Sequence, residues 1–334
     1  MLDYIVWNMQ PEIIEGFRVR WYGLFFAIGF FVSYSCLSKI FNREGLSQKE
    51  LDRFTFLTFV LLIVGLRLGH TLFYEWDFYS QNPLRILYIW EGGLASHGGA
   101  IGLLLAFFLF SRRSGRSFLW ITSRAAIVIP FTAGCVRLGN LMNSEIYGVA
   151  TNLPWAFVFL RDSVIQASPQ QLTDILTQSG VVSATAYNQL LDFFTTHAQV
   201  FAHGLPYSSL KAILVENHFM IADRSNVLVQ ALVNHGLLQA HHPTQMYEAL
   251  VYFATFAVLM YYYFSRKTVA HVSQYFILGF ILVVVFGFRF VVEFIKNNQV
   301  DFEQSMPLNM GQLLSLPFIV FGVWCWYKFF TAKE

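Results

Sequence analysis

Charged residues are scarce in this sequence. Asp, Glu, Lys and Arg make up 13% of the 334 residues and apolar residues make up 56%, whereas soluble globular proteins average about 25% and about 45–50%. A soluble surface cannot be built from so few charges. The composition therefore excludes a pair of ordinary soluble domains and indicates a chain that crosses a membrane several times.

Cysteines, long basic tracts and an N-terminal signal are also lacking. Cys36, Cys135 and Cys325 stand singly inside apolar runs, so we expect small core residues and no disulfide framework or zinc site. The net charge of +2 and the short basic tracts argue against nucleic acid as a partner. The first residues carry no basic stretch followed by an apolar run, and we expect no cleavable signal peptide.

The sequence does contain long apolar runs. A window of about 19 residues predicts seven transmembrane helices: Val19 to Ile40, Phe54 to Trp76, Leu94 to Phe110, Phe118 to Met142, Thr244 to Phe264, Val272 to Lys296 and Met310 to Phe330. We therefore expect an all-α polytopic membrane protein in three parts. Residues 1–142 hold helices one to four, residues 143–243 form a head, and residues 244–334 hold helices five to seven.

The basic residues of the connecting loops lie on one side of these helices. Twelve of the 22 Lys and Arg follow the first, third, fifth and seventh helices or begin the fourth, and the positive-inside rule makes that side cytoplasmic. The N-terminus and residues 143–243 are then outside, and the C-terminus is inside. A strand-like run at Trp155 to Leu160 and helix-like runs near Gln170 to Gln178 and Ala184 to Ala198 predict an external α+β head. Five of its histidines (His197, His203, His218, His235 and His241) lack a metal-ligand spacing.

Polar residues inside the predicted helices gather in one half of the membrane. Each ionisable group at the centre costs roughly 2.5–3.5 kcal/mol. Counted at about 1.5 Å per residue, the outer half holds Tyr22, Arg67, His70, His97, Arg137, Asn140, Gln245, Glu248, Arg289, Glu293, Gln312 and Ser315. One polar cavity that opens to the outer leaflet explains this better than scattered ion pairs. A channel or a proton relay would need polar groups through the full thickness.

The spacing of these residues suggests an anionic ligand. Arg137 and Asn140 are three residues apart and Arg289 and Glu293 are four apart, so each pair shares a helix face. Arginine binds phosphate through two parallel hydrogen bonds, which favours a lipid headgroup. A structural salt bridge is the alternative for Arg289, and a structural histidine is the alternative for His97. The glycines around His97 (Gly92, Gly93, Gly98, Gly99 and Gly102) allow close helix packing.

Seven motifs in chain order resemble those of the prolipoprotein diacylglyceryl transferase family of bacterial membrane enzymes. They are Arg20-Trp-Tyr22-Gly23, Arg67-Leu-Gly, GG-x3-HGG around His97, Arg137-Leu-Gly-Asn140-Leu-Met-Asn143-Ser-Glu145-Ile-Tyr-Gly148, His242-Pro-Thr-Gln245-x-Tyr247-Glu248, Arg289-Phe-Val-Val-Glu293-Phe and Met310-Gly-Gln312-x-x-Ser315-x-Pro317. The chain departs from the family pattern at Val136, often Gly, at Phe286, often Tyr, and at Lys296, often Arg. Its head is also longer than usual.

The resemblance implies a reaction at the bacterial cytoplasmic (inner) membrane without a metal or organic cofactor. The diacylglyceryl group of phosphatidylglycerol moves to the lipobox cysteine thiol of a prolipoprotein signal peptide, and glycerol phosphate is released. His97 would take the thiol proton, Arg137 and Arg289 would stabilise the leaving phosphate, and Glu293 would hold Arg289. Tyr22, Asn140 and Glu145 would orient glycerol hydroxyls or arginine side chains. The implied lipid-binding residues are Arg67, His97, Arg137, Asn140, Asn143, Gly148, Gln245, Glu248 and Arg289.

Two other classes are alternatives. An outer-leaflet phospholipid-binding or lipid-flipping transporter would share the outer site but would need an inner counterpart. An intramembrane protease would need a pair of aspartates, an HExxH motif or a Ser-His arrangement, and the sequence offers none that is convincing.

Overall fold

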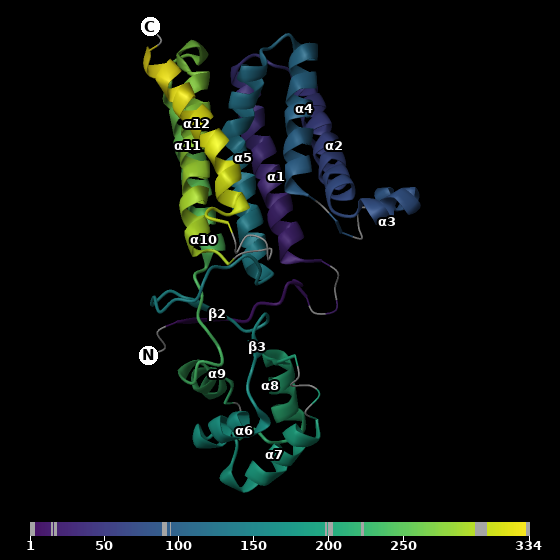
Figure 1. Ribbon diagram of the computed structural model, residues 1–334. Coiled ribbons are helices and arrows are strands. Elements are labelled where there is room, and N and C mark those ends of the chain that lie inside the picture. The colour runs from purple at the N-terminus through teal and green to yellow at the C-terminus, as the bar shows by residue number, and fades with distance from the viewer. Residues whose placement is uncertain are drawn as a thin grey trace. The chain divides into compact units, whose positions relative to one another are not determined.

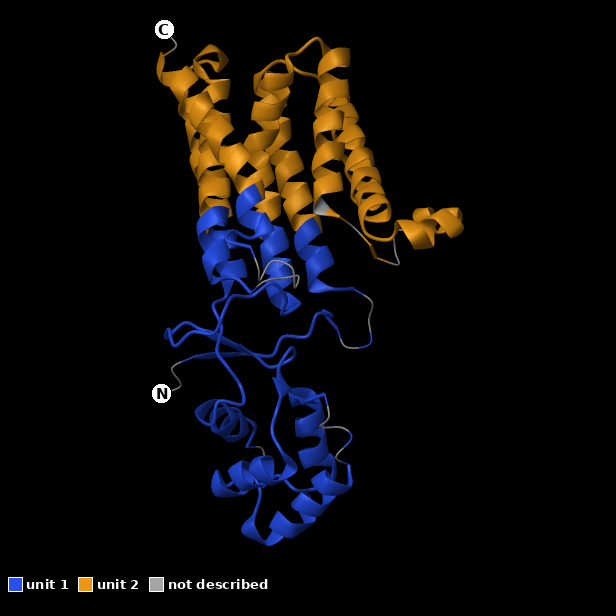
Figure 2. Ribbon diagram, in the orientation of Figure 1, with its two compact units in different colours: residues 1–26, 135–250, 289–313 blue, residues 27–134, 251–288, 314–334 orange. Residues whose placement is uncertain are grey.

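The structure is a computed structural model that describes residues 4–14, 16, 19–88, 92–93, 95–197, 199, 203–221, 224–297 and 306–331. It contains two compact units (Figure 2). Unit 1 comprises residues 1–26, 135–250 and 289–313, and unit 2 comprises residues 27–134, 251–288 and 314–334. Each unit is thus assembled from three separate stretches of the chain.

Long helices occupy the seven predicted ranges (Figure 1). They are α1 (Trp21–Arg43), α2 (Gln48–Phe73), α4 (Ser96–Ser114), α5 (Phe118–Met142), α10 (Thr244–Ser265), α11 (Gln274–Val292) and α12 (Met310–Thr331). The largest difference is at α2, which begins at Gln48 and not at Phe54. Ser47 caps it, because its hydroxyl accepts from the Glu50 N–H while the Glu50 carboxylate accepts from the Ser47 N–H.

Five of these helices are long and apolar enough to cross a membrane by length and composition. Within the described residues they are α1, α2, α5, α12 and the stretch from Gln274 to Ile295 that includes α11. The finding supports a mostly helical chain with several membrane spans. Because α4 and α10 fall outside this set, the count of seven spans stays a prediction.

Glycines set the contact between α2 and α4 in unit 2. A Cβ atom added to Gly98 would lie 2.7 Å from the Gly69 Cα, and one added to Gly102 would meet the Leu61 carbonyl. The two backbones therefore touch where any side chain would separate them. Short helices α3 (Trp76–Gln81) and η1 (Pro83–Leu87) follow α2.

Unit 2 also buries one ion pair among aromatic rings. Arg124 Nε lies 2.7 Å from Glu44 Oε1, and both side chains are 2% exposed. Trp120 and Tyr263 donate to the same carboxylate at 2.6 and 2.8 Å. With these donors the carboxylate is well satisfied, as a buried charge requires.

The segment 143–243 of unit 1 contains both short strands and helices. We call this segment the head. Strand β2 (Phe157–Phe159) lies inside the predicted strand run, and it pairs in parallel with β1 (Ile5–Trp7) near the N-terminus. Strand β3 (Val164–Ile165) pairs in antiparallel fashion with β4 (Leu205–Pro206). The helices are α6 (Pro169–Gln178), η3 (Ala184–Ala186), α7 (Tyr187–Thr196), α8 (Tyr207–Glu216) and α9 (Ser225–Asn234).

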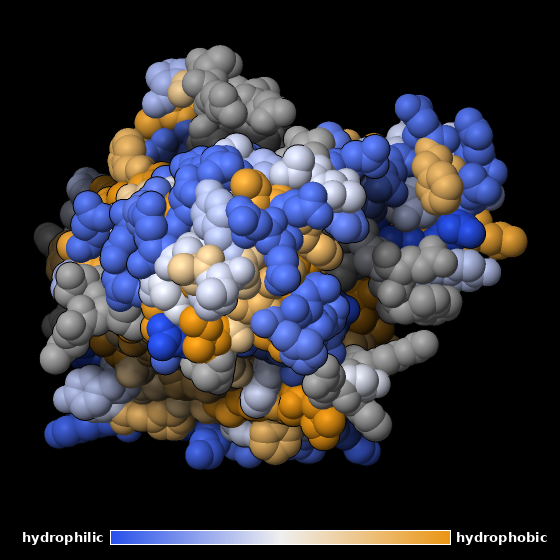
Figure 3. All heavy atoms as spheres, turned by 90° about the horizontal axis from the view of Figure 1, so that it is seen from below, coloured by the Kyte–Doolittle hydropathy of each residue, from blue (hydrophilic) through white to orange (hydrophobic). Residues whose placement is uncertain are grey.

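The head has its own apolar core and a polar surface. Leu172, Leu190, Phe194, Leu210 and Leu232 are fully buried in one cluster. Figure 3 shows a mostly hydrophilic face over this segment, with small scattered apolar patches. Tyr4, near the N-terminus, completes this cluster, so the first residues of the chain pack with the head.

Candidate functional site

The turn after α5 carries the longest motif of the sequence. Asn140 Nδ2 donates to Glu145 Oε1 at 2.8 Å, and Asn143 Nδ2 donates to the same oxygen at 3.2 Å. Ser144 and Ile146, on either side of Glu145, have φ values of 55° and 61°. A left-handed conformation is uncommon for a β-branched residue and costs about 1–3 kcal/mol. The two amides and the two strained residues thus fix Glu145 in one position.

The start of α10 holds this turn from the other side. Gln245 Nε2 donates to the Glu145 carbonyl at 2.6 Å, and Thr244 Oγ1 donates to the Ile146 carbonyl at 2.9 Å. Gln245 is fully buried, and its Oε1 has no hydrogen-bond partner in the described part of the chain. The structure therefore connects Gln245 to the turn through the nitrogen of its amide and leaves the oxygen buried without a hydrogen-bond partner among the described residues.

Gly148 marks the point where the turn meets the end of α11. A Cβ at this position would lie 2.8 Å from His242 Cβ and 2.9 Å from Thr244 Cγ2, and it would also meet the Ile295 carbonyl. The Gly148 N–H donates to the His242 carbonyl at 2.8 Å. Only glycine fits here, so its expected place in the site is explained by packing.

Five charged side chains of unit 1 form a continuous chain of alternating sign. Arg137 Nε lies 3.2 Å from Glu248 Oε2, and Glu248 Oε1 lies 3.2 Å from Lys296 Nζ. Lys296 Nζ lies 3.1 Å from Glu293 Oε1, which is 3.9 Å from Arg289 Nε. We call these residues the charge chain. Its middle is buried, with Glu248 at 0% and Lys296 at 3% exposure, whereas Arg137 at 16% and Arg289 at 38% form more accessible ends.

Residues before and within α12 support Glu293. Asn309 Nδ2 donates to Glu293 Oε2 at 3.1 Å, and a Cβ on Gly311 would lie 2.6 Å from the Glu293 Cδ. The Gln312 N–H donates to Asn309 Oδ1 at 2.9 Å, and the Asn309 N–H donates to Gln312 Oε1 at 3.1 Å, as in a helix cap. The carboxylate is therefore shared by several groups and does not serve Arg289 alone.

Tyr22 is brought close to the same helix end. A Cβ added to Gly139 would lie 2.7 Å from the Tyr22 Cδ2, so the ring packs on the backbone between Arg137 and Asn140. Trp7 donates through Nε1 to the Leu141 carbonyl at 3.0 Å. The N-terminal segment and the start of α1 thus lie against the last turns of α5 in unit 1.

Arg67 of unit 2 is bonded to η1 and to the loop that follows it. Its Nε and Nη2 donate to the carbonyls of Ile86 and Arg85 at 2.8 and 2.7 Å. Nη1 donates to the carbonyls of Gly92 and Gly93 at 2.5 and 3.2 Å. The residue is 3% exposed, so Arg67 anchors this loop, and its expected contact with lipid stays a prediction.

His97 lies in an aromatic setting within unit 2. Its ring centroid is 5.2 Å from that of Phe73 and 5.7 Å from that of Tyr74. His70, one helix away, contacts Glu75 at 3.4 Å between Nε2 and Oε2. The structure describes these residues and the charge chain each within its own unit, so the proposed meeting of His97 with Arg137 stays a prediction.

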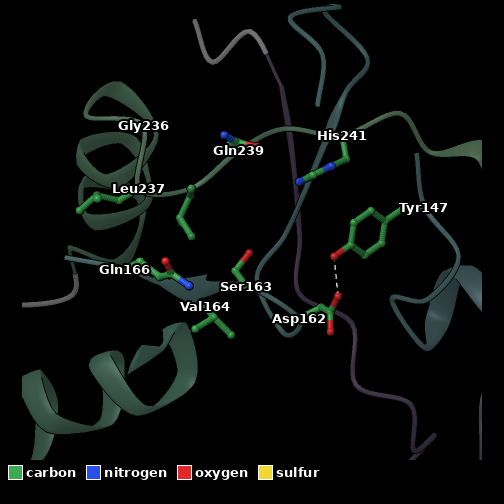
Figure 4. Close-up of a pocket in the computed structure, with 10 residues that line it drawn as sticks. Tyr147, Asp162, Ser163, Val164, Gln166, Gly236, Leu237, Gln239 and His241 are labelled. Atoms are coloured by element: carbon green, nitrogen blue, oxygen red, sulfur yellow. Dashed lines mark hydrogen bonds between the residues drawn. The ribbon is translucent and has the colours of Figure 1, made fainter. Parts of the chain in front are cut away.

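A polar cavity of about 300 Å³ lies beside the turn in unit 1 (Figure 4). Tyr147 donates to Asp162 Oδ2 at 2.5 Å, and both burial and this carboxylate raise the pKa of the phenol. His241 donates through Nδ1 to the Gly148 carbonyl at 2.9 Å, and burial lowers the pKa of its imidazole. Ser163, Gln166 and Gln239 also line this cavity.

Sequence reasoning paired Arg289 with Glu293 but did not find the partner of Arg137. Glu248, the partner of Arg137, comes from α10. Lys296 was noted only as a departure from the family pattern. Asn309 was not singled out at all. The one signal available was the shared depth of these polar residues, since spacing along one helix cannot reveal a pair formed between helices.

The apolar helices and the charge chain define an integral membrane protein with a polar centre suited to an anionic group. The chain belongs to the prolipoprotein diacylglyceryl transferase family, whose sequence profile matches residues 11–328. This confirms the resemblance carried by the seven motifs.

Relatives of nearly equal length share this assignment. The phosphatidylglycerol–prolipoprotein diacylglyceryl transferase of Porphyromonas gingivalis is 35% identical, over 96% of this chain and 93% of that protein. The protein of the same name from Bacteroides fragilis is 31% identical over 100% and 98%, and that of Tolumonas auensis is 33% identical over 96% and 95%. These similarities favour a transferase over the transporter and the protease.

Proposed function

We propose that this protein transfers the diacylglyceryl group of phosphatidylglycerol to the cysteine thiol in the lipobox of a prolipoprotein signal peptide. The observation that carries the proposal is the family match over nearly the whole chain. The charge chain supports it, because two guanidinium groups with accessible ends suit the phosphate of an anionic lipid. Phosphatidylglycerol, the prolipoprotein and the surrounding lipid are thus the partners, and nucleic acid is not.

The reaction exchanges one bond for another at a glycerol carbon. The thiolate sulfur forms a bond to this carbon while the bond from the carbon to the phosphate oxygen breaks. Glycerol phosphate leaves with the electron pair, so negative charge grows on the phosphate. Arg289, 38% exposed, and Arg137, held through its Nε by Glu248, stabilise this charge.

The thiol proton needs an acceptor, since a cysteine with a pKa near 8.5 is mostly protonated at neutral pH. We assign this role to His97, which lies in the first turn of α4. Tyr22, Asn140, Asn143 and Glu145 orient the glycerol hydroxyls. The contacts of Gln245, Gly148, Glu248 and Arg67 indicate their roles.

Gln245 holds the turn through Nε2, and because it is fully buried it acts by position. Gly148 and Glu248 act by position, because Gly148 is closely packed and Glu248 is fully buried. Arg67 acts by holding the loop that contains Gly92 and Gly93. No residue of this set requires a metal or an organic cofactor for its role.

We also propose that all seven long helices span the bacterial inner membrane. The N-terminus and the head, residues 143–243, are then outside and the C-terminus is cytoplasmic. The one-sided distribution of Lys and Arg supports this orientation. The mostly hydrophilic face of the head (Figure 3) supports its place in water and not in lipid. The proposed three parts, residues 1–142, 143–243 and 244–334, follow this topology along the chain. The two compact units differ from them, because each unit combines three separate stretches.

The test is a mass spectrum of a lipobox peptide incubated with the purified protein and phosphatidylglycerol vesicles. We expect the peptide to gain the mass of one diacylglyceryl group, and a matched peptide with serine in place of cysteine to gain nothing. An unmodified cysteine peptide would refute the transferase. Lipid movement between leaflets without peptide modification would support the transporter.

A further inference from the structure

We propose that Lys296 is a positioning residue that couples Arg137 to Arg289. Its ammonium group lies 3.2 Å from Glu248 and 3.1 Å from Glu293, and these two carboxylates each contact one arginine. The lysine is therefore the central link of the charge chain. This proposal rests on the proposed function, in which both arginines stabilise the leaving phosphate.

Because Lys296 is buried, it does not contact the substrate and instead holds other residues in position. Its side chain is 3% exposed and Glu248 is fully buried. A buried ammonium is stable only with good partners, and here both hydrogen-bond partners are carboxylates. In this setting the two carboxylates cannot move apart or together without loss of a charge-assisted bond.

The backbone of Lys296 ties the charge chain to the turn after α5. Lys296 and Gly148 form an antiparallel bridge, and the Val149 N–H donates to the Ile295 carbonyl at 2.9 Å. The same residue thus fixes the turn through its main chain and both arginines through its side chain. A shift at Lys296 is transmitted to Glu145, Arg137 and Arg289 together.

The charges of this group explain why the central cation matters. Three cations and two anions alternate, so every charge has neighbours of opposite sign. Without the ammonium, two carboxylates would face each other across the gap, and like charges at short range repel. Each would then move with its arginine, and the two guanidinium groups would lose their fixed separation.

The experiment measures transfer per folded molecule in Lys296→Met and Lys296→Arg. We expect Lys296→Met to lower kcat by about 10²-fold, the effect typical of a small misplacement of catalytic groups, while KM for phosphatidylglycerol changes little. Lys296→Arg keeps the central charge and should stay close to the wild type. The matched control is Arg124→Met, which breaks the buried pair with Glu44 in unit 2 and should reduce the yield of folded protein without changing kcat.

A double-mutant cycle separates positioning from a purely structural role. With Lys296 present, we expect the losses caused by Arg137→Lys and Arg289→Lys to be strongly non-additive, because the two groups act together. In the Lys296→Met background the losses should become nearly additive. A structural lysine would change the folded fraction and leave this coupling intact.

Each outcome decides the proposal. Wild-type kcat in folded Lys296→Met, or unchanged coupling, would overturn it. If Lys296→Met does not fold, Lys296→Gln, which retains a donor, replaces it. If neither folds, Lys296→Arg decides, since additive arginine losses there would exclude coupling through this position. A wild-type protein that transfers nothing would refute the function itself, whereas a transferring protein with unchanged coupling would refute only this inference.

Discussion

Arg137 and Arg289 differ in how the protein holds them. Arg137 is mostly buried and lies 3.2 Å from a carboxylate of another helix, whereas Arg289 is more exposed and lies 3.9 Å from Glu293 in its own helix. The shorter contact restricts Arg137 more. We therefore expect Arg137 to depend on its planar shape, since a fixed guanidinium can offer two parallel hydrogen bonds to phosphate.

Arg137→Lys keeps the charge and removes that planar fork. We expect a folded protein that is slower by about 10²–10³-fold, the loss typical of one fixed transition-state donor. Turnover is measured against the folded fraction at several lipid concentrations. Normal turnover in well-folded protein would contradict the bidentate role and would assign the phosphate to Arg289.

The proposed base gives a second test at this scale. His97→Gln should fold and bind lipid but lose about 10²–10⁴ in rate, as expected for acid–base catalysis. A peptide with selenocysteine, which ionises more readily, should recover part of the loss. If lipid binding fails and the selenol gives no recovery, His97 holds the headgroup or the structure.

His241 provides a pH-dependent test of stability in the head. Burial lowers the pKa of its imidazole despite the bond to the Gly148 carbonyl. The unfolded chain therefore takes up a proton at higher pH than the folded one, so stability is full above the ordinary histidine pKa of about 6.5 and falls as the pH drops through it. The melting temperature of the wild type should fall more on acidification than that of His241→Asn. Equal slopes would show that His241 is not responsible.

At the scale of elements, hydropathy predicted the positions of the long helices well. The seven ranges agree with α1, α2, α4, α5, α10, α11 and α12 because a run of apolar residues is a local signal. The sequence did not predict α8, α9 or the pairing of β1 with β2, which joins residues 5–7 to residues 157–159. Pairing between distant residues leaves no periodic trace in one sequence.

The difference between local signals and distant pairing also explains which contacts of the site could be predicted. The four-residue spacing identified Arg289 and Glu293, yet their 3.9 Å separation is the longest in the charge chain. The tighter contacts of Glu248 with Arg137 and Lys296 join different elements. Equal membrane depth placed Glu248 in the predicted site, but its partners required coordinates.

Gly148 offers a test of how elements meet. Gly148→Ala should destabilise the protein by about 1–3 kcal/mol, as overpacking does, because the new methyl would meet the Ile295 carbonyl, His242 and Thr244. Gly287→Ala in α11 is the control, since a Cβ there meets nothing within 4 Å. Thermal unfolding compares the two, and equal stability would show that the turn can move away from α11.

At the scale of the whole molecule, orientation is the property to test. In a protein whose native cysteines are replaced by alanine, Glu216→Cys in the head should react with a membrane-impermeant thiol reagent added outside intact cells. Ser114→Cys, next to the basic residues at the end of α4, should react only after the membrane is opened. The reverse pattern would invert the topology and remove the argument from membrane depth.

The composition of unit 1 has a consequence for biosynthesis. Its charge chain needs side chains from three stretches of sequence, around residues 137, 248 and 289–296. If the seven helices insert in chain order, Arg137 enters the bilayer before its carboxylate is made, and Glu248 enters before its lysine is made. On the proposed topology, we therefore expect newly made chains to pass through an intermediate whose charged side chains lack their partners in lipid. Chains stopped before residue 296 should be degraded faster than chains stopped after it.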